Sequence, residues 1–287
     1  PVAVGKFRRG NAEFEDIDCN TQVMRVASVK DGKVIFLSDP FYIKESGELH
    51  FYRAGKELQD ITVFRKFAKV QELWLQRRML GGIFEGGNNL DFSEKDTLHI
   101  ITELPERLLN TSRPSCYGPY RYVRYFGPKN GFCNIADMYV YDVDGKLLTG
   151  KPIGVPGSYS GDNKYDYWSA LDGDNTTSFD SRMGYGAWVG LDFGEPRKIG
   201  KIIYTPRNRD NHVRPGDEYE LFYCDVNWKS AGRVVASSDS ILYRGVPSGV
   251  LYILNNLTRG NQIRVFSYDE GVQEWLRPKQ NKYDNLN

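Results

Sequence analysis

The chain has 287 residues, which is long enough for two domains of ordinary size. Its 38 basic and 37 acidic residues leave a formal net charge of +1, which argues against a nucleic-acid-binding protein, since such a protein needs a strongly basic face. No apolar run approaches the roughly 20 residues that span a bilayer, so we expect no membrane insertion. The 19 Tyr, 15 Phe, 29 Gly and 13 Pro are typical of a β-rich, turn-rich protein.

Two Asp-Gly pairs mark predicted hairpins. Asp31-Gly32 separates the alternating segments 21–29 and 33–37, and Asp144-Gly145 separates 138–143 from 146–150. Asp-Gly favours the tight turn that joins neighbouring antiparallel strands. The sequence therefore predicts antiparallel pairing at both places.

Helical periodicity is scarce along the chain. Residues 57–80 are the best helix candidate, but they contain segments 61–67 and 73–77, which also read as strands. Short alternating segments between turn residues are typical of antiparallel sandwiches. In the second half of the chain we expect such strands at 188–194, 198–206, 217–224, 250–257 and 263–268.

A Gly- and Pro-rich segment suggests a domain boundary. Residues 150–162 hold two Pro, four Gly and two Ser. We therefore predict an all-β protein with two tandem antiparallel β-sandwiches. The first is a divergent β-sandwich over 1–152, in which 1–56 either complete the sandwich or form a separate small β unit. The second covers 157–276, and a polar, frayed tail follows at 277–287.

The four cysteines do not form a metal-ligand pattern. Cys19, Cys116, Cys133 and Cys224 are far apart, without a CxxC pair. We expect Cys133 and Cys224 to be buried or half-buried small apolar side chains. One disulfide remains an open alternative.

The segment from Ala170 to Thr177 is rich in oxygen donors. Ca²⁺ takes six to eight hard oxygen ligands, and a tight loop can supply backbone carbonyls, as at Ala170, together with the side chains of Asp172, Asp174 and Thr177. The alternative is an Asx-rich turn whose oxygens are satisfied by its own backbone. We expect a structural calcium ion that holds a long loop in place.

Four motifs in order resemble a known family. They are ALDGDNTTSF at 170–179, WVGLDFG at 188–194 with a following proline, KIIYTPR at 201–207 and YELFY at 219–223. With them, residues 158–276 resemble the discoidin, or coagulation factor five/eight type C, domain. This is a galactose-binding-like jelly roll that bacterial family 32 carbohydrate-binding modules share. The first half, from about Ile61 to Tyr141, resembles only the later part of such a domain.

The resemblance implies a sugar site and a further calcium ligand. In sugar-binding members the arginine of the third motif bonds ring hydroxyls, and Arg207 matches it. Asp180 stands where histidine is often found, which puts galactose-type specificity in doubt, although a carboxylate accepts hydroxyl hydrogen bonds. The implied acidic calcium ligand near the C-terminal strand is Glu274. The remaining candidate contacts are Asn208, Asn211 and His212, with Tyr185, Tyr167 and Trp168 as aromatic platforms; the alternative for Trp168 is core packing, which is usual for a lone Trp before a loop.

Enzyme signatures fail on inspection. The glycines at 184–190 are followed by strand residues, whereas a phosphate cradle needs a helix N-terminus. We therefore expect a non-catalytic carbohydrate-binding module pair of an exported bacterial glycan-utilisation protein, located in the periplasm or at the cell surface. No signal-peptide pattern opens the chain at Pro1, so export rests on the resemblance. The alternative is a structural or protein–protein interaction module without sugar binding.

Overall fold

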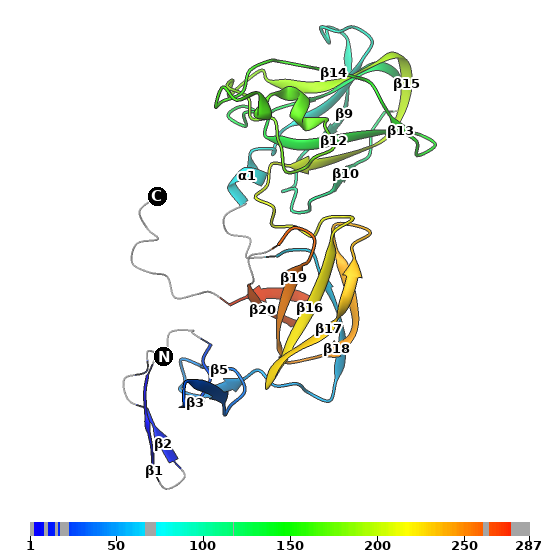
Figure 1. Cartoon of the computed structure of the whole chain (residues 1–287). Coiled ribbons are helices and arrows are strands. Elements are labelled where there is room, and N and C mark those ends of the chain that lie inside the picture. The colour runs from blue at the N-terminus through cyan, green and yellow to red at the C-terminus, as the bar shows by residue number, and fades with distance from the viewer. Residues whose placement is uncertain are drawn as a thin grey trace. The chain divides into compact units, whose positions relative to one another are not determined.

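The chain forms two compact units, most of whose regular structure is β-strand (Figure 1). The computed structural model describes residues 3–8, 11–14, 17, 23–66, 73–116, 118–260 and 264–276. Unit 1 comprises residues 1–67, 216–236 and 241–287, and unit 2 comprises 68–215 and 237–240. The predicted all-β class is confirmed. Within the described ranges, no helix is long and apolar enough to cross a membrane.

One long strand organises unit 2. Strand β15 runs over 19 residues, Trp188–Pro206, and changes partners along its length. Its first part pairs with β11 (Pro119–Phe126) and β14 (Lys151–Gly154), and its second part with β12 (Ile135–Asp142) and β10 (Asn110–Ser112). The sheet continues through β8 (Ile83–Gly87) and β9 (Lys95–Ile100) beyond β11, and through β13 (Leu147–Leu148) beyond β12. The two strands predicted at 188–194 and 198–206 are thus one continuous strand.

The core of unit 2 lies between the two parts of this sheet. Phe84 of β8 packs against Tyr125 of β11 and against Tyr204 of β15, with ring centroids 5.2 Å apart in both pairs. Val189 and Ile202 lie on opposite parts of β15, and both are fully buried. Each side chain of this size stabilises the fold by about 1.5–3 kcal/mol when it leaves water. A single strand therefore contributes side chains to both layers that enclose the core.

Unit 1 combines a five-stranded sheet with a two-stranded one. The order of the larger sheet is β17-β16-β19-β20-β21, while β7 (Leu58–Val63) pairs with β18 (Ile241–Pro247). Its core takes Ile61 from β7 and Tyr243 from β18, with Tyr219, Tyr252 and Phe266 from the larger sheet. The strands of the larger sheet are β16 (Glu218–Asp225), β17 (Asn227–Val235), β19 (Leu251–Asn256), β20 (Val265–Asp269) and β21 (Val272–Trp275).

Three short hairpins precede β7 in unit 1: β1–β2 (Lys6–Arg8 with Asn11–Glu13), β3–β4 (Ala27–Lys30 with Lys33–Phe36) and β5–β6 (Phe41–Ile43 with Leu49–Phe51). In β3–β4 the turn residues Asp31 and Gly32 both have positive φ, at 50° and 73°. This is the left-handed turn that Asp-Gly favours, so the predicted hairpin is confirmed. The Asp144-Gly145 hairpin also forms, between β12 and β13.

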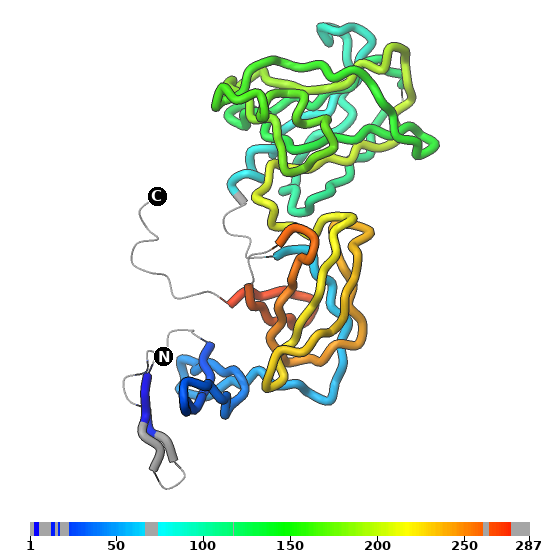
Figure 2. Tube along the Cα trace, in the orientation of Figure 1, coloured from blue at the N-terminus to red at the C-terminus, as the bar shows by residue number. Residues whose placement is uncertain are grey.

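The chain divides at places other than those predicted. Strands β11 and β12 of the expected first sandwich pair with β15 of the expected second, and residues 151–154 are strand β14 inside unit 2. The Gly/Pro-rich segment near 150–162 therefore marks turns and close contacts within one unit: a side chain at Gly154 would meet the ring of Tyr167 at 2.7 Å. Figure 2 follows the path by colour, with blue and yellow-to-red parts of the chain both in unit 1.

Two further predictions, the helix at 57–80 and the grouping of the four motifs, differ from the structure. The helix candidate 57–80 is divided: its first part is strand β7, and α1 is limited to Leu73–Arg77. The alternating residues of β7 are buried against unit 1, which favours the strand. The fourth motif of the resemblance, residues 219–223, lies in β16 of unit 1 rather than with the other three. The tail 277–287 is outside the described residues.

Candidate functional site

The structure brings together two of the predicted sugar contacts. Arg207 follows the end of β15, and Asp180 follows Phe179, whose full burial anchors the segment. The Nη1 atom of Arg207 lies 2.5 Å from Oδ2 of Asp180. The exposed fractions of the two side chains are 29% and 14%. The two side chains therefore pair with each other and still reach solvent.

Two residues that the sequence did not indicate extend this pair. Asn134 donates from Nδ2 to Oδ1 of Asp180 at 2.6 Å, and its own Oδ1 accepts from Nη1 of Arg78 at 3.0 Å. Asn134 is fully buried, whereas Arg78 is half-buried. A chain of hydrogen bonds thus connects Arg207, Asp180, Asn134 and Arg78. We call these four residues the arginine network.

The turn that carries Asn134 has an uncommon backbone. Phe132 and Cys133 both have positive φ, at 54° and 50°. Gly131 lies so close to the end of α1 that a Cβ there would be 2.4 Å from the carbonyl oxygen of Arg78. Non-glycine residues in this region cost on the order of 1 kcal/mol each, and such strain gathers at functional sites. The turn and α1 therefore hold Arg78 and Phe132 side by side.

Aromatic rings lie next to the arginine network. The guanidinium of Arg78 lies 4.6 Å from the ring centroid of Trp74 and 5.2 Å from that of Phe132. Phe132 in turn meets the edge of Tyr159 at 5.9 Å. Trp74 is 45% exposed and Tyr159 70% exposed. Exposed rings of this kind can cover the C–H face of a sugar. The sequence did not indicate Trp74 or Tyr159, because nothing in their local pattern distinguishes them from other surface aromatics.

The predicted platforms take different places. Tyr185 is 66% exposed, with its ring against the edge of Phe126. Its neighbour Gly184 accepts a hydrogen bond from the amide of Asn130, in the loop that leads to Phe132. Tyr167 instead packs beside the unit 2 core, and Trp168 lies edge-on to it. Tyr185 remains a candidate for contact with a ligand, whereas the position of Tyr167 favours a packing role.

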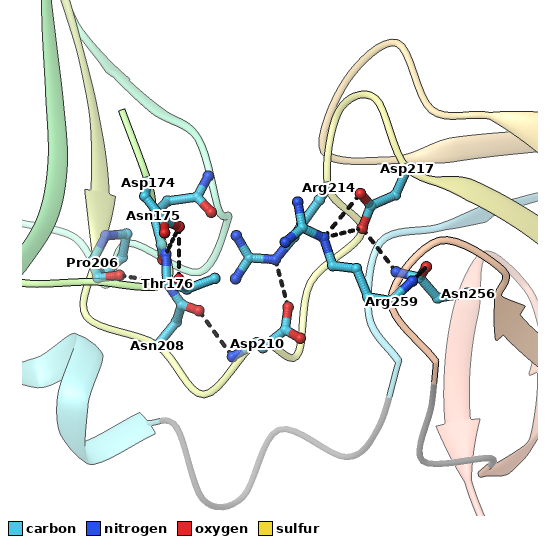
Figure 3. A network of polar contacts seen from close by, with 10 residues as sticks. All are labelled: Asp174, Asn175, Thr176, Pro206, Asn208, Asp210, Arg214, Asp217, Asn256 and Arg259. Carbon is cyan, nitrogen blue, oxygen red and sulfur yellow. Dashed lines mark hydrogen bonds and ion pairs between the residues drawn. The ribbon is translucent and has the colours of Figure 1, made fainter. Parts of the chain in front are cut away.

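Three predicted polar contacts point to structural roles. Asn208 Nδ2 donates to the carbonyl of Asn175 at 3.1 Å and to that of Pro206, and its Oδ1 accepts from the amide of Asp210 (Figure 3). Asn211 and His212 are almost completely buried, and Nε2 of His212 lies 3.2 Å from the carbonyl of Glu106. Both side chains are thus buried, which favours a structural role for Asn211 and His212 over contact with a ligand.

Asn208 connects the arginine network to residues 170–177, which we call the Asp172 loop. Within that loop, Asp172 Oδ1 accepts from the amide of Asp174, and Asp174 Oδ1 accepts from the amide of Thr176. Thr177 Oγ1 donates to Asp172 Oδ2 at 2.8 Å. Figure 3 shows Asp174, Asn175 and Thr176 beside Asn208. The loop thus has the self-bonded Asx turns of the alternative interpretation, next to the site residues.

The predicted calcium ligands do not all belong to one unit. Ala170 is buried at the end of a short 3₁₀ helix, close to Asp172 in the chain, but Glu274 lies on β21 of unit 1. Glu274 is paired there with Ser267 of β20, so it does not complete a ligand set within unit 2. Among the residues that the structure describes, no group of three or more His, Cys, Asp or Glu side chains could hold a metal ion.

A buried carboxylate lies near enough to the Asp172 loop to be affected by its charges. Asp137 of β12 has no exposed surface and accepts hydrogen bonds from the Tyr139 hydroxyl and the Met138 amide. Burial raises the pKa of Asp137 to about 6, and the negative charges of Asp172 and Asp174 act in the same direction. A cation at the loop would relieve this repulsion. The sequence did not single out Asp137, because its strand pattern resembles that of an ordinary core strand.

The described cysteines are reduced thiols. Cys133 and Cys224 are buried, as predicted, while Cys116 is half-buried and accepts a hydrogen bond from the Tyr120 hydroxyl. Burial raises the pKa of both buried thiols, which makes them poor nucleophiles. Cys19 is outside the described residues.

Comparison of the chain with protein-family models, with curated proteins and with solved structures found no match. The assignment of the candidate site therefore rests on the geometry of its own residues.

Proposed function

We propose that unit 2 is a non-catalytic glycan-binding module of an exported bacterial protein that takes part in glycan utilisation. The observation that carries the proposal is the Arg207–Asp180 pair, with both side chains partly exposed. A guanidinium donates to sugar hydroxyls and a carboxylate accepts from them, while Trp74 and Tyr159 offer exposed rings nearby. The proposal is narrower than a pair of modules, because these groups all belong to unit 2.

The position of the matching segments supports the proposal. Residues 68–141 belong to the stretch that resembles the later part of a discoidin-like domain, and residues 170–207 carry three of the four motifs of the resemblance. Both segments lie in unit 2, so we assign the proposed site to this unit.

The sugar site is tested by calorimetry with mono- and oligosaccharides. Binding at one shallow site should be weak, with a Kd on the order of 0.1–1 mM. Arg207→Ala removes the main donor and leaves Asp180 without its cationic partner, so we expect affinity to fall at least about tenfold. Arg197→Ala, which removes a 47% exposed arginine elsewhere on β15, is the matched control. Affinity that survives Arg207→Ala unchanged would remove the site.

A structural calcium ion at the Asp172 loop is part of the proposal. Asp172, Asp174 and Thr177 would supply side-chain oxygens, and Ala170 a backbone carbonyl. Added calcium should then raise the Tm of unit 2, and a chelator should lower it. Asp172→Asn should weaken this response by removing a charge from the site, and Asp60→Asn, at an exposed carboxylate of unit 1, serves as control. A Tm that calcium leaves unchanged in the wild type contradicts the assignment.

Unit 1 favours a second candidate function, that of a protein–protein interaction module. On the β3–β4 hairpin Val29 is 71% exposed, its cross-strand partner Val34 57% exposed, and Phe36, which alternation places on the same face, 44% exposed. Apolar side chains gathered on one surface are typical of contact sites. Sizing of the protein, alone and with Val29→Ser and Val34→Ser, tests this: self-association that the substitutions abolish supports it, and a monomer in both cases speaks against self-association.

A further inference from the structure

Among the described buried and half-buried arginines of unit 2, Arg78 differs from the others in its charge environment. The buried and half-buried arginines that have a carboxylate partner form the pairs Arg107–Asp239, Arg121–Asp192, Arg124–Glu85, Arg207–Asp180 and Arg214–Asp210. Arg78 is also half-buried, but it makes no ion pair with a described carboxylate. Its positive charge is therefore not balanced by the protein in this part of the chain.

The surroundings of Arg78 strengthen its attraction for an anion. The rings of Trp74 and Phe132 lie against its guanidinium, at 4.6 and 5.2 Å, and keep part of it out of water. A charge interaction in such partly dry surroundings is stronger than one in bulk water. The hydrogen bond to Asn134 uses one of the five N–H groups of Arg78 and fixes the orientation of the fork.

The position of Arg78 is defined relative to the proposed sugar contacts. Asn134 bonds Arg78 through Oδ1 and Asp180 through Nδ2, so one amide group separates the two. Asp180 already has a cation, since Arg207 lies at 2.5 Å. The arginine network therefore has two positive charges and one negative. A ligand held at Arg207 and Asp180 would bring a neighbouring substituent to Arg78.

We infer that the site selects sugars that bear an anionic group, a carboxylate or a sulfate, and that Arg78 binds this group. The inference rests on the proposed glycan-binding function and names its substrate class. Carboxylates and sulfates both accept paired hydrogen bonds from the planar guanidinium fork. Trp74 and Phe132 form the wall behind Arg78, and Tyr159 continues this aromatic surface beside Phe132.

The test compares neutral and anionic forms of the same sugars by calorimetry at low salt. The probes are galactose, galacturonate and a sulfated galactose, together with glucose and glucuronate, and an array of neutral, carboxylated and sulfated oligosaccharides widens the search. We expect the anionic forms to bind about tenfold more tightly than their neutral counterparts. Added salt should reduce this difference. The carboxylated and sulfated arms show which anion the site prefers.

Three variants assign the preference to Arg78. Arg78→Gln should remove the difference between anionic and neutral forms while weak neutral binding persists, and Arg78→Lys should restore part of it, since the charge returns without the planar fork. Arg113→Gln removes an exposed arginine of the same unit and should change nothing. An unchanged Tm in each variant shows that folding is retained.

The outcomes separate the two proposals. Equal affinity for neutral and anionic sugars in the wild type overturns the inference and leaves the glycan-binding function standing. An anion preference that survives Arg78→Gln overturns the role of Arg78. If neither neutral nor anionic sugars bind the wild type, the proposed function falls, and the inference falls with it.

Discussion

In unit 2 the strands β8, β11 and β15 face a shared core, whereas in unit 1 every residue of the β3–β4 hairpin is exposed. Both regions contain β-branched residues with the same intrinsic preference: Val123 is fully buried, while Val29 is 71% exposed. Strand preference is therefore not what distinguishes them. The difference is the presence of a second sheet layer, which β15 supplies in unit 2 by pairing along both of its parts.

The largest expected effect comes from matched leucines in the two units. Leu98 on β9 is fully buried in unit 2, and Leu49 on β6 is 47% exposed in unit 1. Leu98→Ala should lower the free energy of unfolding of unit 2 by about 2–5 kcal/mol, because it leaves a cavity. Leu49→Ala should change unit 1 by about 0.5 kcal/mol or less. Denaturant titration measures both, and equal effects would contradict the contrast.

The next effect concerns the pH dependence of unit 2. The pKa of Asp137 is raised to about 6 in the folded protein, against about 3.9 in an unfolded chain. The folded state therefore holds the proton more tightly between these values. The resulting stabilisation is fully present below pH ~3.9 and is lost as the pH rises through about 6.

Asp137→Asn tests that pH dependence. In the absence of calcium, the variant should lose the decrease in Tm between about pH 4 and 6, since it has no group to ionise there. Asp60→Asn, on an exposed carboxylate of unit 1, should keep the wild-type profile. Identical profiles for the wild type and Asp137→Asn would show that this carboxylate does not ionise within that window.

The smallest expected effect is a difference in the rates at which the native thiols are labelled. Cys133 lies in the core of unit 2 and Cys224 is buried in unit 1, while Cys116 is half-buried. In a Cys19→Ser background, a thiol reagent should label Cys116 first. As denaturant is added, Cys133 should report the opening of unit 2 and Cys224 that of unit 1. Simultaneous labelling at every denaturant concentration would indicate one cooperative unit instead of two.

Local pattern predicted a large part of the strand structure. The Asp31-Gly32 and Asp144-Gly145 turns and the strands at 217–224 and 250–257 all appear close to where alternation places them. These features depend on neighbours in the chain, which a sequence displays directly. The pattern did not separate helix from strand at 57–80. There the structure has strand β7, which is buried in unit 1, followed by the short helix α1 of unit 2, and the two elements pack against different partners.

The candidate site divides in the same way. Arg207 and Asp180 were predicted, and the structure joins them. Asn134 and Arg78 were missed, since they lie 46 and 102 positions before Asp180 and reach it only through the turn at Gly131 and the end of α1. Asn211 and His212 were candidate contacts because they closely follow Arg207 in the chain, whereas the structure buries both side chains.

By itself, the sequence determined that the chain is all β, where its Asp-Gly hairpins turn, and that its charges nearly cancel, because these properties belong to residues and their immediate neighbours. Only the tertiary structure decided how the strands are shared between two units and which half-buried arginine among the described residues of unit 2 lacks a carboxylate partner. Both depend on contacts between distant segments, such as β11 with β15 and Arg78 with Asn134, whose formation is set by burial and packing.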